Sequence, residues 1–292
     1  MINIGLTGWG DHDDLYLPGT KPKDKLIKYS AHFSVVEVDS SFYAVQPAER
    51  MARWTEETPD HFSFIVKAYQ GMTGHLRGKP YFPDTDSMYA AFMESLAPMI
   101  EKGKMKAVLF QFPPWFDCNR ENVGTLRSIK DRMQHIPCAL EFRHRSWFEG
   151  EMMHRTLAFM KKEGWIHSIC DEPSAGQGSI PTVLSATDAD LSIVRFHGRN
   201  ASGWHQSGAP NWREVRYLYR YNEEELSEWK ERLDQLEKQS QEICVVFNNN
   251  SGGDAAANAK QLMTMLGMIP QPLASEVIRK KQDEEPEQLE LF

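Results

Sequence analysis

Polar and charged side chains gather at the ends of several short apolar runs in this chain. An unpaired charge buried within a strand is costly, so charges collected at strand ends point to a shared polar site. Carboxylates, an imidazole and guanidinium groups in one place could do acid–base chemistry, hold a metal ion or bind an anion. The residues concerned are Glu37, Asp39, Lys67, Gln111, Glu141, Arg143, Asp171, Arg195, His197, Asn248 and Asn249.

Some of these residues are spaced two apart, and side chains two apart on a strand share a face. Glu37 and Asp39 could therefore share acid–base work or a metal ion. The predicted catalytic residues are Glu37, Glu141 and His197, and these three with Asp39 are the candidate ligands for one divalent metal ion. The alternative is that each carboxylate makes a structural ion pair with a strand-end cation, and that His197 is a neutral hydrogen-bonding residue.

Cations and glycines predict a site for an anion such as phosphate. A guanidinium group offers two parallel donors, and bare backbone amides at a helix N-terminus also suit a phosphate. The segment 246–258 runs from a strand through two glycines into an Ala-rich helix, with Asp254 as the expected N-cap. Asp254 would repel a phosphate, so a turn that needs glycine only for its geometry is the alternative. The predicted substrate contacts are Trp9, Lys67, Gln111, Arg143, Arg195, Asn248, Asn249, Gly252 and Gly253, of which Trp9 would stack on a sugar or base.

Strand patterns alternate with helical patterns along the chain, which predicts βαβ units and a parallel sheet. Eight strands favour closure into a single TIM-type (β/α)8 barrel, whose active sites lie at the C-terminal ends of the strands. An open doubly wound sheet is the alternative, but it would normally carry a glycine-rich fingerprint after its first strand. The expected strands are Ile2–Gly8, Val35–Ser41, Phe62–Ala68, Ala107–Phe112, Pro137–Arg143, Ile166–Glu172, Leu191–Gly198 and Glu242–Asn249.

Long loops are expected after three strands, over residues 70–85, 172–189 and 199–211. Such loops at the C-terminal face of a barrel often bind ligands, and variable surface structure is the alternative. We expect residues 1–268 to form the barrel and residues 269–292 to form a flexible acidic tail. The expected helices are Lys23–Ala31, Ala48–Glu57, Ser87–Lys102, Glu121–Gln134, Gly150–Glu163, Glu223–Gln239 and Asp254–Leu266.

The composition is that of an ordinary globular protein, with 41% of the 292 residues hydrophobic and 25% charged. No apolar run approaches the length of about 20 residues that crosses a bilayer, so we expect no membrane segment. The chain begins in a strand pattern without a signal peptide, and its four cysteines lie far apart, which predicts buried free thiols and a cytoplasmic protein. The net charge of −8 gives no support for strong nonspecific binding to nucleic acid.

A series of short motifs follows in a specific order along the chain: Gly5–Trp9, Glu37–Tyr43, Gln111–Pro114, Glu141–His144 with Ser146 and Trp147, Arg195–Gly198, and Asn248–Asn249 with the Ala-rich helix. In this order they resemble the YecE-like family, also called domain of unknown function 72, over about residues 2–267. The resemblance implies a barrel related to the triosephosphate isomerase fold. It transfers no catalytic role, because the activity of that family is not established. The family often has Asn at the position of Asp39, which weakens the case for a metal ligand there.

The last five residues, Gln288–Phe292, resemble the Gln-Leu-x-Leu-Phe peptide by which bacterial replication and repair proteins dock on the DNA sliding clamp. Leu291 and Phe292 could fill an apolar pocket, and Gln288 could supply polar contacts, with Leu289 beside it. The acidic residues that precede the peptide would keep it extended and reachable. The alternative is a terminus that packs its Leu and Phe back on the barrel.

These features lead to three hypotheses. The first is a barrel hydrolase or lyase that acts on a phosphate-bearing or nucleic-acid-related substrate and is recruited to the sliding clamp, where docking would raise its local concentration. The second is a sugar-phosphate isomerase-like enzyme unrelated to DNA, which would turn over without DNA and ignore loss of the tail. The third is a noncatalytic module that holds a ligand in the same polar pocket.

Overall fold

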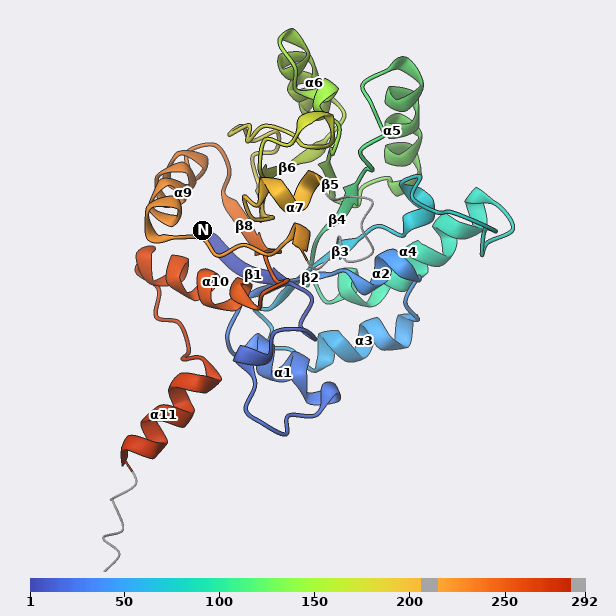
Figure 1. Cartoon of the computed structure of the whole chain (residues 1–292). Helices are drawn as coiled ribbons and strands as arrows, with labels where there is room; N and C mark the ends of the chain where they lie inside the picture. Colours follow the sequence, from blue (N-terminus) through green and yellow to red (C-terminus); the bar gives the residue numbers. More distant parts are fainter. Residues whose placement is uncertain (206–214, 285–292) are drawn as a thin grey trace, which may run out of the picture.

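Eight parallel strands close into a barrel in the order of the chain (Figure 1). The computed structural model describes residues 1–205 and 215–284. The closed barrel confirms the predicted fold class, and each expected strand is present with its ends moved by a few residues. The strands are β1 (Ile2–Thr7), β2 (Val35–Val38), β3 (Ser63–Lys67), β4 (Met105–Gln111), β5 (Cys138–Glu141), β6 (Trp165–Asp171), β7 (Leu191–Phe196) and β8 (Glu242–Phe247).

Helices surround the barrel on its outer side (Figure 1). Their start signals are local: Asn119 caps one helix through its side chain, and Asn222 with Glu225 forms a capping box at another. Their apolar faces pack on the strands, as where Trp229 lies 4.8 Å from Phe196 between ring centres. The helices are α1 (Lys25–Ser30), α2 (Ser40–Tyr43), α3 (Ala48–Glu56), α4 (Thr85–Glu101), α5 (Arg120–Met133), α6 (Glu151–Lys162), α7 (Ala201–His205), α9 (Glu223–Leu236), α10 (Asp254–Met265) and α11 (Ala274–Glu284).

An apolar region and a polar layer fill the inside of the barrel. The apolar region consists of small and branched residues: Val35, Ile65, Ala107, Leu109, Ala139, Ile166, Leu191, Ile193, Cys244 and Val246. Because side chains alternate along a strand, the residue two positions further on points inward at the next level. Those positions hold Glu37, Lys67, Gln111, Glu141 and Arg195. The alternation of the strands therefore places a polar layer directly above the apolar region, at the C-terminal end.

The structure corrects several expected boundaries. Strand β2 ends at Val38 rather than at Ser41, because the chain turns into the short helix α2 and leaves Asp39 at its N-terminal end. Helix α10 is preceded by Gly253 at φ 81°, so Asp254 is the first helical residue and not the N-cap. That left-handed conformation is one that glycine adopts without strain.

The predicted flexible tail differs from the structure over part of its length. Ala274–Glu284 forms helix α11, which Figure 1 shows pointing away from the barrel. Its first residue, Ala274, is buried, and Val277 is half-buried, so an apolar edge holds the start of the helix. The clamp-like peptide lies outside the described residues.

The sequence predicts buried free thiols and no membrane-spanning segment. All four cysteines are free, and three of them are buried, as predicted. Among residues 1–205 and 215–284, the longest apolar stretches of helix fall short of what is needed to cross a bilayer.

Candidate functional site

Arg195 links two buried carboxylates at the centre of the polar layer. Its Nε and Nη2 donate to the two oxygens of Glu37 at 2.8 and 2.7 Å, and its Nη1 donates to Oε2 of Glu141 at 2.7 Å. The three side chains are at most 1% exposed. Such pairing offsets the cost of burying each charge alone. The geometry thus favours the ion-pair alternative for both carboxylates, since both are paired with Arg195.

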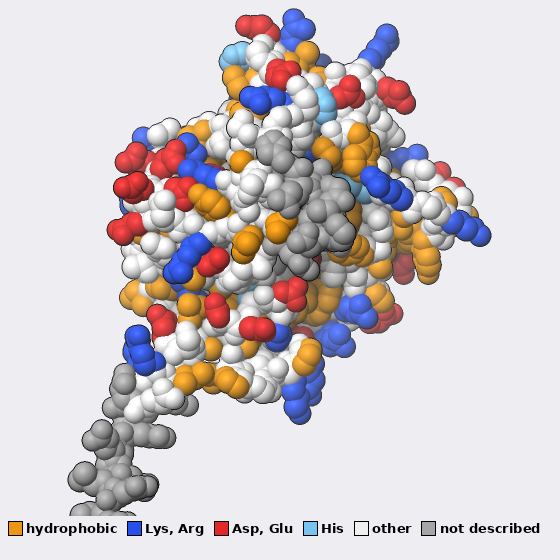
Figure 2. Space-filling view, in the orientation of Figure 1, with side chains coloured by type: hydrophobic (Ala, Val, Ile, Leu, Met, Phe, Trp, Pro, Cys, Tyr) orange, Lys and Arg blue, Asp and Glu red, His pale blue; other side chains and the backbone are white. Residues whose placement is uncertain are grey.

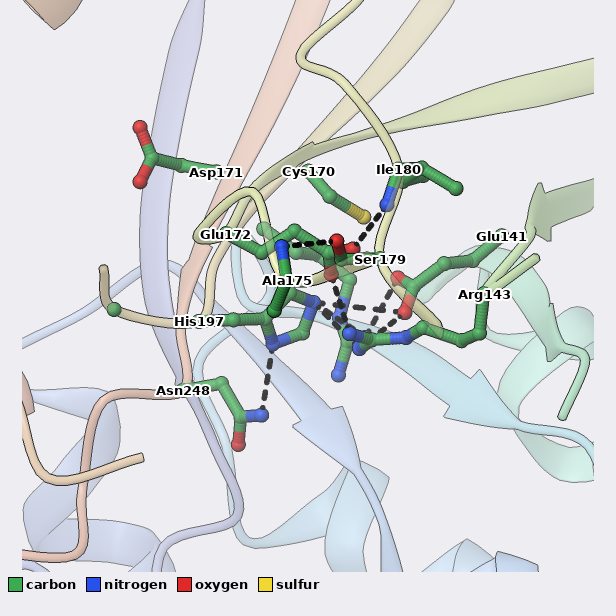
Figure 3. Close-up of polar contacts among 12 residues, drawn as sticks. Glu141, Arg143, Cys170, Asp171, Glu172, Ala175, Ser179, Ile180, His197 and Asn248 are labelled. Carbon is green, nitrogen blue, oxygen red and sulfur yellow. Dashed lines mark hydrogen bonds and ion pairs between the residues drawn. The ribbon is translucent and has the colours of Figure 1, made fainter. Parts of the chain in front are cut away.

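Arg143 extends this network toward a carboxylate that the strand-end pattern did not single out. Its Nη2 lies 2.6 Å from Oε1 of Glu141, and its Nη1 lies 2.5 Å from Oε2 of Glu172 (Figure 3). Glu172 also accepts a hydrogen bond from the backbone N–H of Ile180 at 2.6 Å. Burial raises the pKa of Glu172 to about 7, with Arg143 acting in the opposite direction. A carboxyl group with such a pKa can exchange protons near neutral pH.

His197 lies between a guanidinium group and an amide (Figure 3). Its Nε2 is 2.8 Å from Nη2 of Arg143, and its Nδ1 is 3.0 Å from the side-chain amide of Asn248. A guanidinium group only donates, so Nε2 accepts, and the proton of a neutral ring sits on Nδ1. The structure places the amide nitrogen of Asn248 at Nδ1, so a hydrogen bond from this proton requires the oxygen and nitrogen of that amide to be exchanged. Burial, together with Arg143 and Arg195, holds the pKa of His197 well below its ordinary value. The geometry therefore favours a neutral, hydrogen-bonded histidine.

Glu141, Cys170 and His197 each offer one ligand atom, and these atoms lie within 4.8 Å of one another. Their surroundings do not fit a divalent cation. Both oxygens of Glu141 face guanidinium groups, and Nε2 of His197 accepts from Arg143. Burial raises the pKa of the Cys170 thiol well above its ordinary value, whereas a metal binds the thiolate. Both oxygens of Glu37 accept hydrogen bonds from Arg195, so the metal hypothesis gains no support from this arrangement.

Two buried donors beside the network have no hydrogen-bond partner within the described ranges. They are the Nε–H of Arg143 and the indole N–H of Trp204, from helix α7. The guanidinium carbons of Arg143 and Arg216 lie 5.3 and 3.8 Å from the centre of the Trp204 ring. An unpaired buried donor costs about 1–3 kcal/mol. Both donors lie beside guanidinium groups, so they are candidates for contact with an anion.

Lys67 ends β3 and Asp39 follows the neighbouring strand β2, so both lie at the same end of the barrel. The ammonium nitrogen of Lys67 lies 4.9 Å from the centre of the Phe42 ring, and no hydrogen bond or ion pair joins it to another residue in the described part of the chain. Burial lowers the pKa of Lys67 and raises the pKa of Asp39. Both groups are half-buried rather than sealed. They are thus polar groups at the barrel mouth that the ionic network does not use.

The predicted glycine-rich phosphate loop is arranged differently from expectation. A side-chain carbon added to Gly252 would lie 3.0 Å from Oδ2 of Asp254, so the carboxylate of the chain itself lies over this loop. Asn249 is fully buried, and its Nδ2 donates to the carbonyl of Tyr219 and to the side chain of Asn258. These contacts favour a structural role for Asn249, Gly252 and Gly253.

The remaining predicted contacts lie at the rim. The ring of Trp9 packs edge-on against Trp54, with 4.8 Å between ring centres. Gln111 is half-buried at the end of β4, where it is in register with Glu141. Trp9 therefore has a packing partner within the protein, whereas Gln111 keeps its place in the predicted polar layer.

Comparison with known proteins agrees with this fold. Residues 3–283 match a family described as "Protein of unknown function DUF72". The chain belongs to this family. Over the full length of both chains it is 56% identical to UPF0759 protein YunF of Bacillus subtilis. It is 32% identical to UPF0759 protein YecE of Escherichia coli over 34% of this chain and 35% of that one.

Crystal structures of other DUF72 proteins have the same architecture. One from Enterococcus faecalis superposes with a TM-score of 0.86 at 38% identity, covering 94% of this chain and 98% of that one. One from Thermotoga maritima superposes with a TM-score of 0.77 at 31% identity, covering 91% and 99%. The resemblance to the YecE-like family is therefore confirmed, and the barrel is shared by the family members compared.

For this DUF72 chain, sequence reasoning chose the wrong residue of one neighbouring pair. Asp171 at the end of β6 lies outside the barrel lumen, where it accepts hydrogen bonds from Arg199, Tyr221 and Trp229. The inward position is Glu172, two residues after Cys170, and the same alternation could have identified it. Arg216 is not among the predicted contacts either, because it follows β7 outside any strand and no spacing rule reaches it.

Proposed function

We propose that the chain is an enzyme that binds a phosphate-bearing substrate at the C-terminal mouth of the barrel. The observation that supports this most directly is the pair of buried, unpaired donors, Nε–H of Arg143 and Nε1–H of Trp204, beside the Arg216 guanidinium. Charged hydrogen bonds to phosphate oxygens would satisfy both donors. Barrel enzymes commonly build their sites at this face.

The proposed reaction class is that of a hydrolase or lyase acting through acid–base groups. Glu172, which is buried against Arg143, has a pKa of about 7, and Asp39 at the mouth has a raised pKa. Glu37, Glu141 and His197 form the floor that holds Arg143 and Arg195 in place. In this arrangement the floor positions the substrate-binding cations, and the proton transfers fall to groups nearer the mouth.

Replacing Trp204 by Phe tests the phosphate site. Trp204→Phe removes the indole N–H and keeps an aromatic ring beside Arg216, so the affinity for inorganic phosphate should fall about 10- to 100-fold, the effect of one hydrogen bond to a charged group. Isothermal titration calorimetry measures the change directly.

Trp165→Phe is the matched control for this test. The indole N–H of Trp165 is also buried and unpaired, but its ring lies 5.6 Å from Phe110 near the N-terminal end of the strands. The control should bind phosphate as the parent protein does. Equal affinities in the parent and in Trp204→Phe would contradict the site.

We further propose that the C-terminal peptide recruits the barrel to the DNA sliding clamp. The support comes from the sequence of Gln288–Phe292 and from helix α11, which carries the chain away from the barrel before it. On the face shown in Figure 2, acidic and basic side chains are interspersed, and acids gather over α9. Docking through the tail would hold the barrel close to DNA, whereas this mixed surface offers no strong attraction to DNA.

Removal of Gln288–Phe292 should abolish retention of the protein on immobilised bacterial sliding clamp. The loss is expected to be complete because Leu291 and Phe292 would supply the apolar anchor of the peptide. Phosphate binding by the truncated chain should be unchanged, since the barrel mouth is untouched. A chain with Glu290→Ala, the variable position of the peptide, is the control and should be retained. Equal retention of full-length and truncated chains would refute docking through these residues.

A further inference from the structure

We propose that Lys67 is a covalent catalytic residue whose amine forms an imine with a phosphate-bearing aldehyde or ketone. This inference rests on the proposed function, because the phosphate group of the substrate would occupy the site beside Arg143 and Trp204. It narrows the substrate class from any phosphate ester to a phosphorylated carbonyl compound.

Lys67 is the last residue of β3 and follows Ile65 by two positions. Ile65 belongs to the apolar region inside the barrel, so the alternation of the strand directs Lys67 inward at the next level. The side chain is half-buried, and a ring of Phe42 lies beside its ammonium group at 4.9 Å. The amine therefore lies at the level of the polar layer and remains accessible from the mouth.

The other cations of this layer differ from Lys67 in their contacts. Arg195 and Arg143 each hold two carboxylates at 2.5–2.8 Å. Both oxygens of Glu37, the carboxylate on the neighbouring strand, are taken by Arg195. The side-chain amine of Lys67 makes no hydrogen bond or ion pair with any residue of 1–205 or 215–284 and lies against the ring of Phe42, so no polar partner holds it away from a substrate. A structural lysine would be expected to hold a carboxylate or a carbonyl oxygen.

Lys104 and Lys260 illustrate that contrast. Lys104 Nζ donates to the carbonyls of Thr55 and Thr58, both at 2.7 Å. Lys260 Nζ donates to the carbonyl of Gln271 and lies 2.8 Å from Nδ1 of His32. Burial lowers the pKa of Lys260 to about 8, so a lowered pKa alone does not distinguish Lys67. Lys67 differs from Lys260 in its greater exposure and in having no hydrogen-bond partner for its amine among the described residues.

The mouth offers a wall for the substrate next to the amine. The ring of Phe42 contacts His75 with 5.1 Å between ring centres, and His75 contacts Trp115 at 5.9 Å. Trp115 is 54% exposed, and the guanidinium of Arg77 lies over its ring at 5.2 Å. A continuous aromatic surface thus leads from Lys67 to solvent. It would exclude water from one side of the imine.

The proposed step balances as a condensation that releases one water. The amine lone pair adds to the carbonyl carbon, the π electrons of the C=O bond move to oxygen, and one proton passes from nitrogen to that oxygen. The resulting carbinolamine loses its hydroxyl group as water after taking a proton from the Asp39 carboxyl group, and the nitrogen lone pair closes the C=N bond. The product is an iminium ion on Lys67 beside the Asp39 carboxylate. Both groups fit these roles, because burial lowers the pKa of the amine and raises that of the acid.

Reductive trapping tests the inference on the full-length protein. The protein is incubated with D-glyceraldehyde 3-phosphate and sodium cyanoborohydride, which reduces an iminium ion to a stable secondary amine, and the labelled lysines are identified by peptide mass spectrometry. Labelling of Lys67 should exceed that of Lys260 by about tenfold or more, the effect of the hydrogen bond that Lys260 would have to break before its amine could react. Lys67→Arg should lose the fast phase of labelling, and Lys106→Arg, which alters a lysine paired with Glu242, should keep it.

Two further outcomes separate this inference from the proposed function. Labelling of Lys67 that is equal with D-glyceraldehyde and with its 3-phosphate would support the nucleophile and contradict the phosphate site. Phosphate binding that depends on Trp204, with no labelling of Lys67 above the other lysines, would overturn the inference and leave the proposed function standing. Lys67→Arg should remain folded, because no ion pair is lost, and its thermal unfolding provides the check.

Discussion

Replacing Arg195 by Met is expected to lower the free energy of unfolding by about 3–5 kcal/mol, the usual cost of removing one partner from a buried ion pair. Arg195 satisfies both oxygens of Glu37 and one oxygen of Glu141, and none of these side chains exceeds 1% exposure. Met has a similar stem, so little volume is lost. The main effect is therefore the unpaired carboxylate of Glu37. Urea unfolding followed by circular dichroism measures the loss.

Glu163→Gln is the control for that comparison. Arg127 and Glu163 form an ion pair at 3.1 Å with side chains 54% and 23% exposed. Solvent screens such a pair, so its loss should cost less than about 1 kcal/mol. A loss for Arg195→Met no greater than that of the control would show that the polar layer does not hold the barrel together.

The polar layer itself was predictable from the sequence, for a specific physical reason. Five of the strands carry, at or near their C-terminal end, a polar residue two positions beyond an inward apolar one, and barrel closure brings those positions together. Glu37, Glu141 and Arg195 meet as a result, although they are far apart in the chain. Their roles were not predictable. Which carboxylate pairs with which cation depends on the spatial neighbours across the lumen, and a spacing rule contains no information on those.

The contact between Trp204 and Arg216 and the position of Asp39 could not be predicted from the sequence, for different reasons. Trp204 and Arg216 approach the site from the connection after β7, so their contact depends on how that connection folds back. Asp39 was assigned to a strand, but the chain turns into α2 directly after it. The turn moves Asp39 out of the ion-pair network and leaves it at the mouth. The structure therefore separates a floor whose side chains belong to the ion-pair network from a mouth whose polar side chains lie outside that network. A list of polar residue types cannot make this distinction.

The paired floor of Glu37, Glu141 and His197 would already be in place when a substrate binds. The floor is held together by its own ion pairs, so it can keep Arg143 in one orientation without help from a ligand. Preorganised donors lose little entropy when an anion arrives. The buried Nε–H of Arg143 is then directed by the floor, while Trp204 adds its donor from α7. This arrangement couples the stability of the barrel to the binding site, since loss of the floor would also release Arg143.

Replacing Glu172 by Gln should change how stability depends on pH. Burial raises the pKa of Glu172 to about 7 in the folded protein, above the value of about 4.3 of an exposed glutamate. The folded state therefore binds more protons than the unfolded state between these values, and the wild type loses stability as the pH rises from about 4.3 to 7. The substituted amide cannot titrate, so it lacks this pH-dependent loss. The free energy of unfolding of the variant, relative to that of the wild type, should therefore rise by about 3 kcal/mol between about pH 4.5 and 8.

The groups that face Glu172 determine how that result is interpreted. Arg143 at 2.5 Å favours the ionised carboxylate, and Glu141 opposes it. If the attraction of Arg143 outweighs burial, the free energies of unfolding of wild type and Glu172→Gln stay parallel over this pH range, and the assignment of Glu172 as a group that titrates near neutrality is refuted. If burial outweighs Arg143, the two curves converge or cross as the pH rises, whereas those of wild type and Glu163→Gln stay parallel. Urea unfolding at a series of pH values decides between the two, and only the second outcome leaves Glu172 able to hold a transferable proton at neutral pH.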